Sequence, residues 1–63
     1  MKKLIFEKLK QMVEDGKLQL GFEKQITEFT LESYKEKDEN TIVCTCVYIE
    51  NGKVFQKYVE LAV

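Results

Sequence analysis

Cys44 and Cys46 are the residues whose types could most readily do chemistry. They lie one residue apart in TIVCTCVYIE, residues 41–50, the most hydrophobic stretch of the chain. In a strand, residues two apart face the same side with Cα atoms about 7 Å apart and parallel Cβ vectors, which does not suit a disulfide. Free cysteine commonly behaves as a small buried hydrophobe. The sequence therefore predicts two reduced thiols that belong to a core.

A reactive thiol at Cys46 is the alternative to this interpretation. The strand register derived below places Lys57 opposite Cys46, and a neighbouring ammonium would lower the pKa of the thiol. Lys57 also falls on the last predicted strand, where an inward-pointing lysine protects a sheet edge against aggregation. We favour edge protection, with the lysine ammonium reaching past the edge to solvent. A thiol-based redox function at Cys46 remains the rival hypothesis.

Other catalytic or metal-binding arrangements find little support in the sequence. The chain has two cysteines and no histidine, so a zinc site would need carboxylates for its remaining ligands. Without histidine there is no Ser-His or Cys-His dyad, and Ser33, the only serine, falls on the predicted core side. No glycine-rich phosphate-binding pattern occurs. We expect no enzyme activity, no metal and no cofactor.

Composition narrows the class of partner and the compartment. The 63 residues form one predicted domain, residues 1–63, with ten basic residues, all lysine, against eleven acidic ones and a net charge of -1. The absence of arginine and of a positive excess argues against nucleic acid as a partner. The apolar run in the opening MKKLIFEKLK is too short for a signal peptide or a membrane span. We therefore expect no membrane association and a cytoplasmic location. The lysine-rich, arginine-free composition suggests an AT-rich bacterial or phage genome.

The predicted elements begin with an amphipathic helix over residues 2–14. Apolar residues recur there at helical spacing, and Asp15-Gly16 supplies a stop. A helix of about thirteen residues does not persist alone in water, so it must pack on something. The apolar residues of this stripe are Ile5, Phe6, Leu9, Met12 and Val13.

Asn51-Gly52 predicts a hairpin, because a type I′ turn needs positive φ at both central positions. One face of this hairpin is apolar except for Lys57. Counting back from the turn pairs Glu50 with Lys53, Tyr48 with Phe55, Cys46 with Lys57, Cys44 with Val59 and Ile42 with Leu61.

A second hairpin is expected between residues 27–34 and 41–48, with a turn through the charged residues 35–40. The expected pairs are Tyr34 with Thr41, Ser33 with Ile42, Leu31 with Cys44, and Phe29 with Cys46. Residues 18–22 also alternate, which predicts a fourth strand that places Leu18, Leu20 and Phe22 on the same inner face. Residues 22–34 fit a helical period as well, although the alternation in TEFTLESY favours a strand.

These registers agree on one inner face, which the helix would cover. The fold class is therefore α+β: one N-terminal amphipathic helix packed across a four-stranded antiparallel meander, in the order α-β-β-β-β. A lone helix can cover one face only, so the other face of the sheet would remain open.

That outer face is the predicted working surface. Its C-terminal half is rich in β-branched and aromatic residues, with Gln56, Glu50 and Glu60 as its expected polar members. The same residues could be present for strand propensity alone. An apolar patch of a few hundred Å² otherwise indicates an interface. The candidate interface residues are Tyr34, Val43, Thr45, Val47, Ile49, Val54 and Tyr58.

We therefore expect a non-enzymatic small protein-protein interaction module, such as a bacterial or phage regulator that binds a target protein. The alternatives are a self-associating structural homodimer with no separate ligand, and the thiol function at Cys46. Exposed tyrosines could also stack nucleic-acid bases. Carboxylates expected around Tyr34 and Tyr58 would repel phosphate, so no nucleic-acid binding is predicted. These carboxylates are Glu28, Glu32, Glu50 and Glu60.

Overall fold

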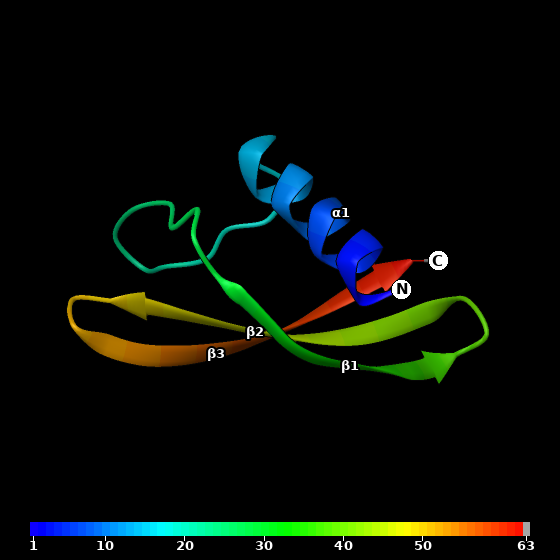
Figure 1. The fold of residues 1–63 in the computed structure, drawn as a ribbon. Coiled ribbons are helices and arrows are strands. Elements are labelled where there is room, and N and C mark those ends of the chain that lie inside the picture. Colours follow the sequence, from blue (N-terminus) through cyan, green and yellow to red (C-terminus); the bar gives the residue numbers. More distant parts are fainter. Residues whose placement is uncertain (63) are drawn as a thin grey trace.

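The protein is an α+β fold in which one N-terminal helix lies over one face of a three-stranded antiparallel sheet (Figure 1). The computed structural model describes residues 1–62. Its elements are α1 (Lys2–Glu14), β1 (Thr30–Asp38), β2 (Thr41–Glu50) and β3 (Lys53–Ala62), with β2 in the centre of the sheet. The helix and the antiparallel meander are as predicted, and the predicted fourth strand is absent from the described residues. No helix within residues 1–62 is long and apolar enough to cross a membrane.

Helix α1 is held by its packing and not by its ends. Its first turn contains no acidic residue, its last turn no basic one, and no side chain caps its N-terminus. The face toward the sheet buries Ile5, Leu9 and Val13, which are three of the five residues of the predicted stripe. Phe6 lies beside this stripe with its ring centroid 5.0 Å from that of Phe29. The helix exists because this face is covered.

The hairpin of β2 and β3 has the predicted register at every pair. Cys46 lies opposite Lys57, Cys44 opposite Val59 and Ile42 opposite Leu61. Asn51 has φ 52° and Gly52 has φ 76°, so both central residues are left-handed as a type I′ turn requires. The two-residue turn fixes the register of β2 against β3. The Asn51-Gly52 signal was therefore sufficient to predict every pair of this hairpin.

The hairpin of β1 and β2 has a different register from the predicted one. Leu31 lies opposite Cys46, Tyr34 opposite Cys44 and Asp38 opposite Thr41, with irregularities between Leu31 and Ser33 and between Glu36 and Asp38. The strand continues through the charged segment expected to be the turn. A tighter turn follows, where the backbone N–H of Asn40 donates to Asp38 Oδ1 at 2.9 Å.

The predicted pairs in this hairpin were wrong for two reasons. Solvated lysine and glutamate side chains do not prevent their backbone from pairing along an outer strand. An irregularity also adds residues to one strand without any marked sequence signal. As a result Ser33 is exposed, and not on the core side as expected.

Residues 15–29 form neither the predicted strand nor the alternative helix. Leu18 and Leu20 are buried as expected, but Phe22 is 91% exposed. The backbone finds its partners locally: Ile26 N–H donates to the Leu20 carbonyl at 3.1 Å, and the Gln25 side-chain amide donates to the Leu18 carbonyl at 2.8 Å. These bonds make a sheet partner unnecessary for this segment.

The core lies between the helix-facing side of the sheet, α1 and residues 18–20. Cys44 and Cys46 have no exposed surface at its centre. The remaining buried apolar residues are Ile5, Leu9, Val13, Leu18, Leu20, Leu31, Ile42, Val59 and Leu61.

Candidate protein-interaction surface

The face of the sheet opposite α1 carries an apolar surface made by β2 and β3. Ile49 lies directly opposite Val54, and Thr45 lies opposite Tyr58. Ile49, Val54 and Tyr58 are 63%, 67% and 68% exposed. Val43, Thr45 and Val47 are half-buried among them. We call these six residues the outer patch, and all six belonged to the predicted interface.

Tyr34 does not belong to the outer patch. Paired residues of an antiparallel ladder project to the same side, and Tyr34 lies opposite the fully buried Cys44. Its side chain is therefore on the helix-facing side, at the edge of the sheet. The expected position on the outer face was wrong, because it depended on the register that β1 does not adopt.

Glu50 also lies on the helix-facing side. It was expected among the polar residues of the outer face, but it is only 8% exposed and follows the alternation that buries Cys44 and Cys46. Its carboxylate accepts the backbone N–H of Phe22 at 2.9 Å to each oxygen and that of Glu23 at 3.3 Å. No sequence signal pointed to this contact, because it joins residues 28 positions apart.

The centre of the outer patch is free of charge. Gln56, opposite Val47, is the polar residue between Val54 and Tyr58 on β3. Glu60 lies farther along the strand and pairs with Lys37, with 2.8 Å between Lys37 Nζ and Glu60 Oε2. The outer face is thus apolar toward the β2–β3 turn and carries an exposed ion pair toward the opposite end of the sheet.

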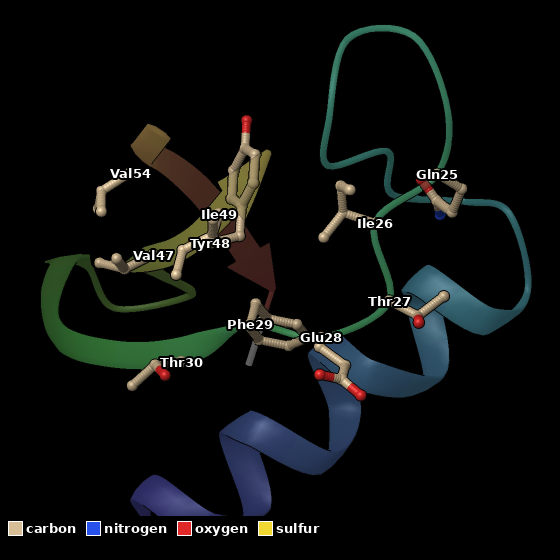
Figure 2. A pocket seen from close by; sticks show the side chains of 10 residues that line it. All are labelled: Gln25, Ile26, Thr27, Glu28, Phe29, Thr30, Val47, Tyr48, Ile49 and Val54. Carbon is tan, nitrogen blue, oxygen red and sulfur yellow. The ribbon is translucent and has the colours of Figure 1, made fainter. Parts of the chain in front are cut away.

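A groove of about 620 Å³ continues the outer patch around the edge of β2 (Figure 2). Ile26 and Phe29, from the segment before β1, line one side of it. Tyr48 and Ile49 line the other, and Figure 2 shows the two sides separated by open space. Val47, Ile49 and Val54 line the groove and also belong to the outer patch. The two features therefore form one continuous surface.

The groove lies beside backbone groups that have no strand to pair with. In a two-residue hairpin the residues flanking the turn exchange hydrogen bonds, so Glu50 bonds to Lys53, and the N–H and C=O of Ile49 point away from β3. The last pair on the other side of β2 joins Val47 to Thr30, two residues before Ile49. Within residues 1–62, no backbone group outside the strands forms a hydrogen bond with the backbone of Ile49. An incoming peptide could pair with β2 there.

The two thiols lie on the opposite face of β2 from the outer patch, in the core. The pKa of Cys46 is raised to about 11, chiefly by burial and to a smaller extent by the nearby Cys44, and Lys57 offsets these effects only in part. Burial also raises the pKa of Cys44. Lys57 instead donates to the backbone carbonyl of Gln19, with 2.6 Å between Nζ and the oxygen. The activation that a thiol function at Cys46 would need is therefore not provided by Lys57.

No group of three or more Cys, Asp or Glu residues within residues 1–62 is arranged to hold a metal ion. Comparisons with protein-family models, curated proteins and solved structures find no match to this chain. Its function is therefore inferred from the geometry of the surface alone.

Proposed function

We propose that the protein is a non-enzymatic interaction module that binds a target protein through the outer patch and the adjoining groove. The observation that carries the proposal is the exposure of Ile49, Val54 and Tyr58 together on a sheet face that neither α1 nor residues 15–29 cover. Exposed strands with neutral, β-branched and aromatic side chains suit protein binding, and Tyr58 is a suitable anchor.

The size of the face favours a partner larger than a second sheet of the same kind. Three strands about 4.8 Å apart, with about ten residues at 3.4 Å each, span roughly 14 by 34 Å, or roughly 480 Å². Stable complexes bury roughly 800 Å² on each partner. A target that covers the face and also places a segment in the groove buries more area than face-to-face packing of two copies does. A regulator that blocks a target's surface would work in this way.

The proposal can be tested by placing a photo-crosslinking amino acid at Tyr58 and, as a matched control, at Leu4. Leu4 is 66% exposed on α1, so it has similar accessibility on the opposite side of the molecule. In a lysate of the organism that encodes the protein, we expect position 58 to cross-link a discrete target and position 4 to give none. Val47→Lys should abolish that product, because it puts a charge into the centre of the patch.

Two results would contradict the proposal. One is the same set of products from both positions, which would indicate nonspecific contact. The other is a product at position 58 that consists only of the chain cross-linked to itself, which would make the outer patch a homodimer interface.

A further inference from the structure

A second groove lies on the helix-facing side of the sheet, at the end where β2 turns into β3. The loop of residues 15–29 lies beside this hairpin end in Figure 1. The groove has a volume of about 640 Å³ and runs between the loop and the hairpin. Its lining residues are Gly21, Phe22, Glu23, Tyr48, Glu50, Asn51, Lys53, Phe55, Gln56 and Lys57.

The loop side of this groove is held firmly in place. The buried Glu50 carboxylate accepts the backbone N–H groups of Phe22 and Glu23. Gly21 has φ +87°, and a Cβ there would lie 2.5 Å from the Lys24 carbonyl oxygen and 2.6 Å from Ile26 Cγ1. The backbone is therefore fixed while the Phe22 side chain projects into solvent. Phe22 is 91% exposed on a fixed backbone, so its side chain is preorganised to insert into another protein surface.

The two sides of the groove are complementary in chemistry. The loop side is lined by the aromatic Phe22 and the acidic Glu23. The hairpin side presents the Phe55 ring, stacked on Tyr48 with centroids 5.8 Å apart, and the ammonium of Lys53. Phe55 is 40% exposed, so its ring has free surface to offer. Since Glu50 holds the loop where it is, the two sides of one molecule do not close on each other.

We propose that a second copy of this chain occupies the groove, and that two copies exchange their Phe22 side chains about a two-fold axis. Phe22 of each copy packs against Phe55 of the other, and Glu23 of each lies near Lys53 of the other. A surface that carries both the projecting ring and its receiving groove can pair with itself, and a two-fold pairing of this kind closes at the dimer. This dimer leaves the outer patch of each copy free, so it is independent of the function proposed above.

The area involved sets the strength of the dimer. A phenylalanine buries roughly 150 to 250 Å² when covered, so two exchanged rings and their grooves come to well under 1,200 Å² in total. Interfaces of that size are weak and transient. We therefore expect a monomer at about 20 μM and a growing dimer fraction toward about 1 mM.

Sedimentation equilibrium over this concentration range tests the dimer. Phe22→Ala should weaken self-association by at least about tenfold, since it removes the inserted ring and leaves the backbone N–H that binds Glu50. Tyr58→Ala, which removes an exposed aromatic of the outer patch, is the matched control and should leave association unchanged. A protein that stays monomeric to about 1 mM, or a dimer that Phe22→Ala does not weaken, overturns the proposal.

A charge exchange tests the orientation of the two copies. Glu23→Lys and Lys53→Glu should each weaken association of the variant with itself by about threefold or more, because each brings like charges together. An equimolar mixture of the two variants should associate at wild-type strength. In the mixed dimer, the lysine introduced at position 23 of one copy meets the glutamate introduced at position 53 of the other, and the second contact stays as in the wild type.

Amide NMR spectra of each variant show whether it is folded. If Lys53→Glu is unfolded, the Phe22→Ala comparison decides. If both variants are folded and the mixture stays weak, the exchange geometry is wrong.

Discussion

Burial, and not the neighbouring cation, sets the acidity of the thiol at Cys46. The side chain has no exposed surface, and its pKa is raised to about 11 from 9.0. Lys57 lies opposite it in the ladder, but its ammonium is directed to the Gln19 carbonyl. A cysteine in this environment is protonated at neutral pH and reacts slowly.

The raised pKa predicts how stability changes in alkaline solution. The unfolded chain loses the Cys46 proton near pH 9, whereas the folded chain keeps it until about pH 11, so the folded state becomes less favourable as the pH rises through this window. The free energy of unfolding should fall by up to about 2 kcal/mol more in the wild type than in Cys46→Ala between about pH 8 and 11. Urea unfolding at several pH values measures this difference.

Cys46→Ala should also lower the free energy of unfolding by about 1 kcal/mol at every pH, because it removes buried surface. This loss is constant with pH, so the dependence of stability on pH is the quantity that tests the raised pKa. Equal slopes in the two proteins would mean that the thiol is not desolvated. Rapid maleimide labelling of native Cys46 at about pH 7 would contradict the same conclusion independently.

At the scale of elements, the loop of residues 15–29 depends on its contacts with the sheet. Glu50 joins the end of β2 to the loop, and Lys57 on β3 joins it again through Gln19. These two strand residues replace the hydrogen bonds that a fourth strand would have supplied. The loop is therefore part of the folded unit, although it has no regular structure of its own.

This dependence predicts unequal costs for two similar glycine substitutions. Gly21→Ala should destabilise the protein by about 3 kcal/mol, from the left-handed backbone and the close approach of Lys24 and Ile26. Gly16→Ala is the control, because it has φ +76° but no atom within 4 Å of the added methyl group, and should cost about 1 kcal/mol. Denaturant unfolding compares the two. Equal costs would show that the loop can move away from Ile26 freely.

At the scale of the whole molecule, one helix covers one face of a small sheet and leaves the other face open. The core is a single layer between them, in which Leu9, Leu20, Val13 and the two cysteines are the most completely buried side chains. No other helix or strand within residues 1–62 covers the second face. The outer patch is therefore exposed in this fold.

The charge distribution of the whole molecule predicts that it does not bind single-stranded nucleic acid. Glu50 is buried, so it cannot repel phosphate from the outer face as expected, but the chain still has a net charge of -1 and no arginine. We expect no binding tighter than about 100 μM at physiological salt. Fluorescence anisotropy with a labelled oligonucleotide measures this. Micromolar, strongly salt-dependent binding would instead identify Tyr58 and the lysines as a nucleic-acid surface.

Local signals in the sequence were enough to determine the helix, the β2–β3 hairpin and most of the core. The spacing of Ile5, Leu9 and Val13 marks the buried face of α1, and Asn51-Gly52 sets the register that pairs Cys46 with Lys57. Both signals act within a few residues, because helical periodicity and a two-residue turn constrain the backbone directly. The six residues of the outer patch follow from that register by simple alternation.

Tertiary structure alone decided the course of residues 15–29, the register of β1 and the positions of Tyr34, Phe22 and Glu50. Each depends on contacts between segments distant in sequence, as in the hydrogen bonds from Phe22 to Glu50. An alternating segment such as residues 18–22 becomes a strand only if a sheet edge accepts it, and here a buried carboxylate and local hydrogen bonds satisfied its backbone first. Sequence periodicity shows which side chains are apolar. Which groups hydrogen-bond to each backbone segment depends on the tertiary structure of the whole chain.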